Sequence, residues 1–429
     1  MPPTPDATAP GAAVPDREVP DRGRGDACPG ALRLHQADDG ALARIRLPGG
    51  LLTDRQALAL AEAAEALGDG ELETTSRGNV QLRGLAPQCA ADLAERLRAV
   101  GLLPSDTHER VRNIVASPLA GLDGTDSADV RAWVRELDAR LCASDWAAGL
   151  SGKFLFALDD GRGDVAALDA DVTLIAGSGA ATADRDRPAL LRLGRAGHGH
   201  PVEAGQEVTA VLDAARSFLD ALRTSGRKAW HLREVPELLP AGSVPLPAFA
   251  GAAPAVGALP GGLSVGLRFG RASAAQWRAL VAAATASAGE LRLTPWRGAV
   301  VPGASADLLP ALAGAGFRTE PGSPWERATA CTGLPGCAKS LADVRSDAAR
   351  ALDTDPRSAA GDGGHDALPV HWSGCERRCG HPAGRWVDVL ATGHGYRVTV
   401  NGPAAAPTAA EVTNEEMAEA VAEARRTTK

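Results

Sequence analysis

Four of the seven cysteines lie in two close pairs near the end of the chain. Five residues separate Cys331 from Cys337, and three separate Cys375 from Cys379. Four thiolates in two local pairs can hold a zinc ion or an iron–sulfur cluster. Structural zinc sites favour spacings of about two to four residues, because a tight turn must aim both sulfurs at one small ion. The wider spacing of the first pair therefore favours a [4Fe–4S] cluster, with zinc or unligated cysteines as the alternatives.

A second group of polar residues lies in the first half of the chain. Guanidinium groups bind carboxylates through two parallel hydrogen bonds, so several of them close together suit a ligand with several carboxylates. Each arginine on its own could equally form a surface ion pair that contributes little to stability. The group comprises four cations and the amide side chains next to them: Arg77, Asn79, Gln81, Arg83, Arg112, Asn113 and Lys153.

The two halves of the chain repeat each other. Three segments of the first half match three of the second in the same order. The first match predicts a strand, a turn, an amphipathic helix and another strand in both copies. One match could arise by chance in Ala-rich sequence, but three in order indicate an internal duplication. The matched segments are 40–84 with 261–303, 109–121 with 326–340, and 150–160 with 372–384.

In this alignment, residues of the basic group occupy the positions that match the cysteines of the second half. Arg112 and Asn113 fall where the second half has its first cysteine pair, and Lys153 falls opposite Cys375. Binding sites often lie where two structural units meet. We therefore expect one site between the two copies, with cations from the first and thiolates from the second.

Composition restricts the partners. The chain has 45 Lys and Arg against 53 Asp and Glu, and its net charge of −8 disfavours nucleic acid. No apolar run reaches the ~20 residues that cross a bilayer, and the N-terminus lacks the pattern of a secretory signal. We expect a cytoplasmic protein with no membrane or nucleic-acid partner. In that compartment an odd number of cysteines indicates metal binding rather than disulfides.

Signals for other cofactors are weak. The chain has no G-x-G-x-x-G or Walker motif, so we expect no nicotinamide, flavin or ATP domain. Electrons would then come from a separate donor, such as a reductase, a ferredoxin or an NADH-linked protein. A mononuclear non-haem iron would need about two histidines and a carboxylate. The histidines available for it carry no assigned role: His198, His200, His371 and His381.

Five motifs together resemble the sulfite/nitrite reductase superfamily: TTSRGNVQLRG, RNIVASPLAG, LSGKF, TACTGLPGC and SGCERRCG. The resemblance covers roughly residues 30–400 and implies a tetrapyrrole beside a [4Fe–4S] cluster. It implies that the matching arginines and Lys153 bind tetrapyrrole carboxylates and that the four paired cysteines hold the cluster. In members that carry siroheme, the last cysteine, here Cys379, bridges the cluster to the siroheme iron.

Two details favour a branch of this superfamily that acts on cobalamin precursors. Leu155 stands where sulfite reductases have a second lysine, and GLPGCAKSLADVR and VHWSGCERRCGHPAG are most similar to that branch. The resemblance then implies an O2-dependent monooxygenase with the tetrapyrrole precorrin-3A as its substrate. The enzyme would hydroxylate C20 and close a γ-lactone with the ring A acetate. An assimilatory sulfite or nitrite reductase with siroheme is the alternative, and an electron carrier with one cluster is the third hypothesis.

The resemblance also implies the fold. We expect an α+β protein of two tandem pseudo-repeats, each a ferredoxin-like half-domain followed by an α/β region that binds the tetrapyrrole or the cluster. Segments rich in Pro, Ala and Gly set the boundaries. The expected parts are a disordered leader (1–28), a half-domain (29–100), a tetrapyrrole-binding region (101–238), a linker (239–260), a second half-domain (261–322), a cluster region (323–402) and a C-terminal tail or helix (403–429).

Overall fold

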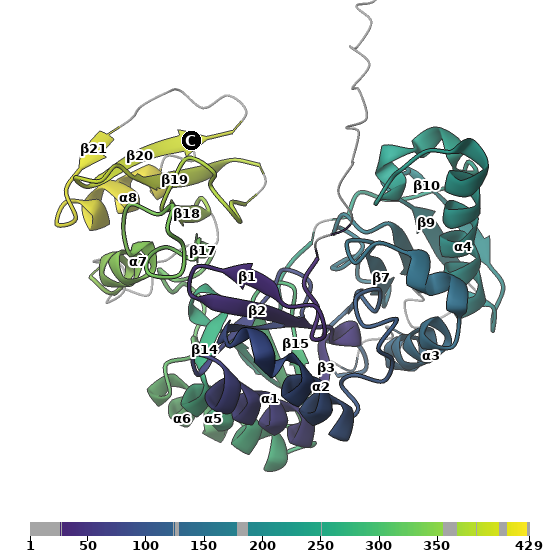
Figure 1. Ribbon diagram of the computed structural model, residues 1–429, viewed down its shortest axis with the longest axis horizontal. Coiled ribbons are helices and arrows are strands. Elements are labelled where there is room, and N and C mark those ends of the chain that lie inside the picture. Colours follow the sequence, from purple (N-terminus) through teal and green to yellow (C-terminus); the bar gives the residue numbers. More distant parts are fainter. Residues whose placement is uncertain are drawn as a thin grey trace, which may run out of the picture.

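The computed structural model describes residues 26, 28–122, 124, 128–177, 188–249, 251–354, 367–382, 384–402 and 410–426, and Figure 1 shows their arrangement. In this part of the chain eight α-helices and four sheets form a mixed α+β fold, as the sequence predicts. Most of the expected leader lies outside the described residues. No helix in the described part is long and apolar enough to cross a membrane.

Two five-stranded sheets form the central body, with the orders β1-β2-β5-β4-β14 and β12-β13-β16-β15-β3. Alternate residues of a strand point to opposite faces. In the first sheet Ala43 and Ile45 are therefore in the core, while Arg44 lies on the other face. The elements are β1 (His35–Ala37), β2 (Gly40–Ile45), β3 (Leu51–Thr53), α1 (Asp54–Leu67), β4 (Glu71–Thr74), β5 (Val80–Leu85), α2 (Ala90–Ala99), β12 (Gly257–Leu259), β13 (Gly262–Gly266), β14 (Arg271–Ser273), α5 (Ala274–Thr285), β15 (Glu290–Leu293), β16 (Gly298–Pro302) and α6 (Leu309–Gly314).

The two halves exchange an edge strand. β3 of the first half pairs with β15, and β14 of the second half pairs with β4. The helices that follow begin alike, because Thr53 and Ser273 each form a capping box with a glutamine three residues further on. α1 and α5 pack against each other, and the indole of Trp277 donates to the carbonyl of Ala57 at 2.9 Å. The two half-domains therefore share one hydrophobic core.

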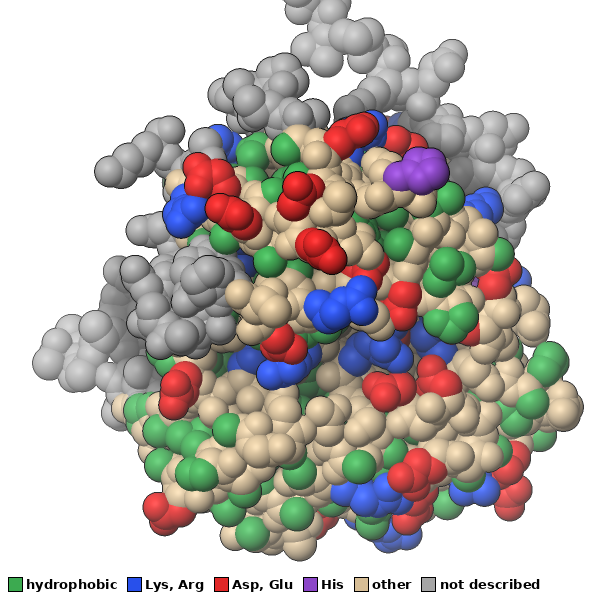
Figure 2. Space-filling view, turned by 90° about the vertical axis from the view of Figure 1, so that its left-hand side faces the viewer, with side chains coloured by type: hydrophobic (Ala, Val, Ile, Leu, Met, Phe, Trp, Pro, Cys, Tyr) green, Lys and Arg blue, Asp and Glu red, His purple; other side chains and the backbone are tan. Residues whose placement is uncertain are grey.

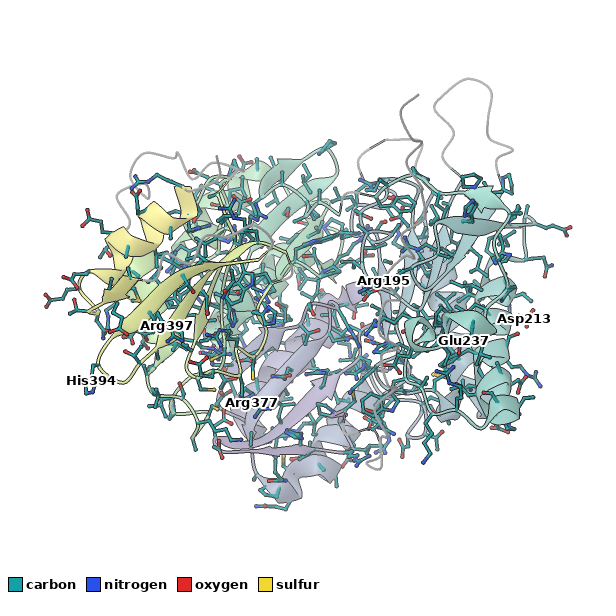
Figure 3. The ribbon with its side chains drawn as sticks, turned by 90° about the horizontal axis from the view of Figure 1, so that it is seen from above. Arg195, Asp213, Glu237, Arg377, His394 and Arg397 are labelled. Carbon is teal, nitrogen blue, oxygen red and sulfur yellow. The ribbon has the colours of Figure 1, made fainter. Side chains whose placement is uncertain are left out.

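An α/β region follows each half-domain, and both regions begin with three parallel strands and continue with antiparallel ones. Seen from above, the strands of the first half-domain lie between the two regions, which Asp213 marks on one side and Arg397 on the other (Figure 3). The elements are β6 (Ile114–Ala116), α3 (Arg131–Cys142), β7 (Phe156–Asp159), β8 (Val172–Ile175), β9 (Ala189–Leu193), β10 (His198–Val202), α4 (Glu207–Ser225), β11 (Val244–Pro245), β17 (Ala328–Ala330), α7 (Val344–Asp353), β18 (Val370–Ser373), β19 (Trp386–Ala391), β20 (Tyr396–Asn401), β21 (Ala410–Val412) and α8 (Met417–Arg426).

Strand pairing gives the true correspondence of the two α/β regions. Ile114 pairs with Phe156 in the first region, and Ala328 pairs with Val370 in the second. Ile114 therefore corresponds to Ala328, and Phe156 to Val370. It follows that the residues after β6 and β7, not the residues before them, correspond to the cysteine loops.

The expected correspondence of Lys153 with Cys375 is wrong. Lys153 precedes β7, as Arg112 and Asn113 precede β6, whereas Cys331 and Cys375 follow their strands. Short motifs rich in Ala and Gly can be aligned with each other in more than one way when the loops between strands differ in length. The matched motifs therefore reveal the duplication, but in the α/β regions they pair residues that do not occupy equivalent positions on the strands.

The segments expected as linker and tail contribute to the sheets. Within 239–260, β11 pairs with β10 and β12 pairs with β13. Near the C-terminus β21 pairs with β20. Met417 and Val421 of α8 are buried in the same core as Trp372 of β18. The last helix is therefore part of the cysteine-bearing region.

Candidate functional site

Two of the paired cysteines follow neighbouring parallel strands. Cys331 comes directly after β17, and Cys375 comes two residues after β18. The carboxyl ends of parallel strands meet at one edge of a sheet, which is where such sheets commonly bind ligands. At this edge the amide of Gly374 donates to the Sγ atom of Cys331 at 3.2 Å. The amide of Cys331 in turn donates to the carbonyl of Trp372 at 2.9 Å.

The loops that carry the cysteines are fixed by their own contacts. The guanidinium of Arg378 donates to Asp388 at 2.6 Å, and the backbone amide of Arg378 donates to the carbonyl of Cys375. Cys331, Cys337, Cys375 and Cys379 are all free thiols. Burial raises the pKa of Cys331, while the amide of Gly374 and the charge of Arg345 oppose that rise. The site thus supplies hydrogen bonds and positive charge to a sulfur that would bind metal as a thiolate.

The sulfurs do not form a compact zinc site in this structure. Four sulfurs on one zinc ion, each at about 2.3 Å, would lie about 3.8 Å apart by tetrahedral geometry. In the part of the chain that the structure describes, no three ligand atoms within 4.8 Å of one another include a cysteine. The preference for a cluster over a zinc ion therefore rests on the spacing of the cysteines in the sequence.

The first cysteine loop docks on the first half-domain. The amide of Ala338 donates to Asp38 at 2.7 Å. Arg83 binds both oxygens of Asp39, at 2.8 and 2.7 Å, and reaches the carbonyl of Gly336 at 3.4 Å. The expected role of Arg83 in tetrapyrrole binding stays a prediction, and in this structure its guanidinium pairs with the carboxylate of Asp39. It holds the β1–β2 turn against the loop that precedes Cys337.

A chain of polar contacts links the first sheet to Cys331. Arg44 donates to the side chain of Gln81 at 2.9 Å, and Gln81 donates to Glu73 at 3.0 Å. Glu73 accepts from Arg345 at 2.7 Å, and Arg345 donates to the carbonyl of Cys331 at 3.1 Å. The predicted residue Gln81 therefore connects the basic group to the cysteine loop.

Further cations line the junction below the cysteine-bearing region. On the face shown in Figure 2, Lys and Arg side chains gather between the upper part and the lower body of the molecule. A hollow at this junction is lined by Arg268, Arg271 and Arg345. These cations have acidic or aromatic neighbours: Arg271 and Arg345 pair with Glu73, and Arg268 lies over Trp325. They stabilise the contact between the two parts of the chain.

Three arginines with few partners lie around Cys28. Arg46 is only 3% exposed. Its one hydrogen bond goes to the carbonyl of Gly152 at 3.3 Å, and Nε and Nη1 have no partner in the described part of the chain. Burial and the charge of Arg44 lower the pKa of Arg46 to about 10. The guanidinium of Arg77 likewise has no hydrogen bond or ion pair with the described residues. Burying cations without anions is unfavourable, so this group suits an anionic ligand.

Lys153 lies beside these arginines. Its Nζ atom is 3.4 Å from the centroid of the Trp230 ring, which is a cation–π contact. The preceding amide of Gly152 donates to Asp26 at 2.6 Å. Although burial opposes ionisation, the amides of Cys28 and Gly152 hold the pKa of Asp26 below its ordinary value. Asp26 thereby fixes the loop that carries Lys153.

The remaining residues of the predicted basic group have other partners. Arg112 donates to both oxygens of Asp138, at 2.6 and 2.7 Å, and to the carbonyl of Leu102 at 3.0 Å. Its guanidinium ties α3 to the loop after α2, and its expected role in tetrapyrrole binding stays a prediction. Asn79 and Asn113 bond to each other at 3.0 Å and join the first half-domain to the α/β region. Neither amide faces the ligand as an unpartnered group.

The four histidines considered for a mononuclear iron form two separate pairs, His198 with His200 on β10 and His371 with His381, which both contact Trp386. His371 is fully buried and bonds to Thr329 at 2.8 Å, and His381 stacks on Trp386. Burial lowers the pKa of His371 to about 3. Among the described residues, no group of three close ligand atoms includes a histidine.

The first α/β region has carboxylates where the second has cysteines. Ser117 follows β6 as Cys331 follows β17, and the amide of Asp160 donates to its hydroxyl at 3.1 Å. Asp159, Asp160 and Asp164 bring carboxylate oxygens within 4.8 Å of one another. All three carboxylates accept hydrogen bonds from the chain. These three aspartates lie at the edge of the first α/β region that corresponds to the cysteine edge of the second. The alignment of sequence motifs does not reveal this correspondence, because it is shifted in register.

Comparison with known proteins agrees with this architecture. A family model described as the nitrite/sulfite reductase ferredoxin-like half domain matches residues 35–100 and 260–315. Precorrin-3B synthase of Sinorhizobium sp is 30% identical over 401 residues, which are 89% of this chain and 84% of that protein. Ferredoxin–nitrite reductase of Synechococcus elongatus is 38% identical over 127 residues, 28% of this chain and 25% of that protein. The solved structure of the Mycobacterium tuberculosis NirA protein has a similar fold, with a TM-score of 0.64 and 20% identity over 88% of this chain and 79% of that chain.

The paired half-domains and the match to nitrite reductases define an enzyme of the nitrite/sulfite reductase type. The chain belongs to the sulfite/nitrite reductase superfamily, and the precorrin-3B synthase of Sinorhizobium sp is its relative over nearly the whole length.

Proposed function

We propose that this enzyme hydroxylates precorrin-3A at C20 with O2 and closes a γ-lactone with the ring A acetate in the cytoplasm, as a step of cobalamin synthesis. The relative named precorrin-3B synthase matches 89% of the chain, whereas the Synechococcus nitrite reductase matches 28%. The observation that carries the proposal is the buried guanidinium of Arg46, two of whose nitrogens have no partner in the part of the chain that the structure describes. Such a group suits a substrate rich in carboxylates.

In this proposal the basic group binds the acetate and propionate groups of the tetrapyrrole. Among the described residues, Nε and Nη1 of Arg46 have no partner, Arg77 is a buried cation, and Lys153 lies over Trp230. Guanidinium forks bind carboxylates in a fixed plane. Contacts from two sides of the site would therefore orient the macrocycle as well as bind it, which is how an enzyme selects one carbon for reaction.

Cys331, Cys337, Cys375 and Cys379 would hold a [4Fe–4S] cluster at the edge of the second α/β region. When bound, the cluster would supply single electrons from an external donor, such as a ferredoxin or an NADH-linked reductase. The chain's own part is to fix the loops. Arg345 and Gly374 direct positive charge and an amide at Cys331, which would compensate the negative charge of the thiolates.

The test is aerobic turnover of precorrin-3A by the purified, cluster-loaded enzyme with a reductant. With ¹⁸O2 the product should gain one labelled oxygen atom by mass, and no product should form without O2. A product that carries oxygen only from water, or unreacted precorrin-3A, would overturn the proposal.

An assimilatory nitrite or sulfite reductase is the second candidate, because nitrite reductases match the chain locally and the NirA fold covers most of it. Leu155, where sulfite reductases of the superfamily have a lysine, disfavours sulfite. This candidate predicts that siroheme remains bound through purification and that the enzyme reduces nitrite or sulfite with a one-electron donor. Absorbance from the cluster alone would speak against it.

A further inference from the structure

A buried histidine–aspartate pair lies beside the basic group. The Nδ1 atom of His231 is 3.0 and 3.2 Å from the two carboxylate oxygens of Asp171. The residues are 6% and 2% exposed. Asp171 directly precedes β8, and its oxygens also accept from the amides of Leu155 at 2.9 Å and Leu232 at 2.8 Å. Four contacts therefore hold the carboxylate in one place.

These contacts decide which nitrogen of His231 carries the proton. A carboxylate that already receives two amide hydrogens is an acceptor, so Nδ1 donates and Nε2 keeps its lone pair. Nε2 makes no hydrogen bond with the described residues, whereas Nδ1 contacts both oxygens of Asp171. The imidazole therefore has one nitrogen without a partner in this part of the chain.

His108 shows the contrast with a structural histidine. It is 4% exposed, similar to His231. Its Nδ1 atom contacts the hydroxyls of Ser105 and Thr107, both at 2.9 Å, and its Nε2 atom contacts the carbonyl of Ser144 at 3.0 Å. Both nitrogens of His108 are used inside the protein. In His231 only Nδ1 makes a hydrogen bond with the described residues.

The pair borders the tetrapyrrole site proposed above. Trp230, the neighbour of His231, lies under the Nζ atom of Lys153. Leu155, whose amide binds Asp171, is two residues from Lys153. Burial lowers the pKa of Arg77, and the negative charge of Asp171 partly opposes this, so Asp171 is within electrostatic reach of that guanidinium. His231 is therefore next to the groups that would hold the substrate.

We propose that His231, positioned by Asp171, delivers protons to the oxygen that is reduced in the tetrapyrrole site. The inference rests on the proposed function. Hydroxylation by O2 consumes two electrons and two protons: one oxygen atom enters the substrate and the other leaves as water. The electrons come from the external donor. The Nε2–H bond of the protonated imidazole breaks, the proton goes to the oxygen that leaves as water, and solvent reprotonates Nε2. Asp171 stabilises the protonated ring between these steps.

Other charged groups lie around the pair. Anions favour the protonated ring and cations oppose it. Glu234 accepts from the amide of Trp230, and Asp169 has its pKa lowered first by Arg195 and also by nearby Arg233 and His231. The charged groups that face the pair are therefore Asp169, Asp171, Glu234, Arg77, Lys153 and Arg233.

The first experiment compares His231→Gln with the parent and with the control His108→Gln, all loaded with the cluster. His231→Gln should lower the rate of product formation by about 10²-fold or more. It should leave precorrin-3A affinity within about 2-fold and iron content unchanged. His108→Gln should keep the parent rate within about 2-fold. If His231→Gln retains the parent rate, the inference is wrong, whereas a parent that never converts precorrin-3A overturns the proposed function instead.

A second measurement does not depend on turnover. Diethylpyrocarbonate modifies accessible imidazole nitrogens, and the modified peptide can be identified by mass. Without ligand His231 should react, and anaerobic precorrin-3A should protect it by about 10-fold or more, which corresponds to occupancy of most sites. His231 that reacts equally with and without precorrin-3A would not face the site, and the inference would be rejected.

Discussion

The backbone amide of Gly374 donates a hydrogen bond to the Sγ atom of Cys331 at 3.2 Å. The equivalent amide in the other copy, that of Asp160, donates to the hydroxyl of Ser117 at 3.1 Å. The two α/β regions therefore share the backbone geometry of this edge and differ in the side chains that they place there. At this edge the first copy places a serine hydroxyl where the second places a thiol.

Replacing one thiol tests the cluster assignment. Cys337→Ser should abolish the EPR signal of the reduced cluster, because a serine hydroxyl is a poor substitute for a thiolate ligand of iron. Cys89→Ser, which changes an isolated and partly exposed cysteine, is the matched control and should keep the signal. An intact signal in Cys337→Ser would remove Cys337 from the ligand set.

Arg83 separates a structural role from a ligand-binding role. Arg83→Ala breaks the pair with Asp39 and the contact with Gly336, so it should lower the free energy of unfolding by about 1–3 kcal/mol. A chelator should then extract iron faster, while tetrapyrrole affinity stays near that of the parent. A rise in tetrapyrrole Kd with unchanged iron release would instead support the role expected from the sequence.

Arg46 should affect binding more than stability. Arg46→Gln removes a buried cation without an anionic partner, so the free energy of unfolding should stay equal or rise. Loss of a hydrogen bond to a charged group is worth about 1.5–3 kcal/mol, so the Kd for precorrin-3A should rise about 10- to 150-fold. Titration by absorbance and urea unfolding measure the two quantities. Arg278→Ala removes an exposed cation paired with Glu65 on the outer helices. This control should change the Kd by no more than about 2-fold and the free energy of unfolding by no more than about 0.5 kcal/mol.

The carboxylate group in the first region should make stability depend on pH. Burial raises the pKa of Asp164 to about 7, and Asp159 adds like-charge repulsion. Because an unfolded chain releases this proton near pH 4, the folded state holds an extra proton between about pH 4 and 7, and stability falls as the pH rises through that window. Asp164→Asn should flatten the dependence. Urea unfolding at pH 5 and pH 8 measures it, and an unchanged difference between the two would contradict the assignment.

Local signals explain how much of the fold the sequence predicts. The capping residues Thr53 and Ser273 and the apolar faces of their helices act over a few residues, so both strand–helix–strand units can be predicted. The strand exchange cannot, because the pairing of Thr53 with Glu290 joins distant residues that carry no pattern of their own. The correspondence of the two α/β regions cannot be predicted for the same reason, because it depends on strand pairing between residues far apart in the chain.

The candidate site is predictable in part. Cysteine spacing is a local pattern, and Arg77 and Lys153 stand in quoted motifs. Arg44 and Arg46 are missed, although ALARIRL predicts a strand and a period of two places both cations on one face. By contrast, the pairing of Arg83 and Arg112 with carboxylates depends on tertiary contacts that no spacing reveals.

The exchanged strands have a consequence for synthesis of the chain. β4 pairs with β5 at once, but it receives its second neighbour only when β14, about two hundred residues later, has left the ribosome. At about 5–20 residues per second the nascent first half exposes a free strand edge for roughly 10–40 s. Open edges invite pairing with other chains, so a fragment that ends before β14 should aggregate. Each half should therefore depend on the other to cover one edge of its sheet.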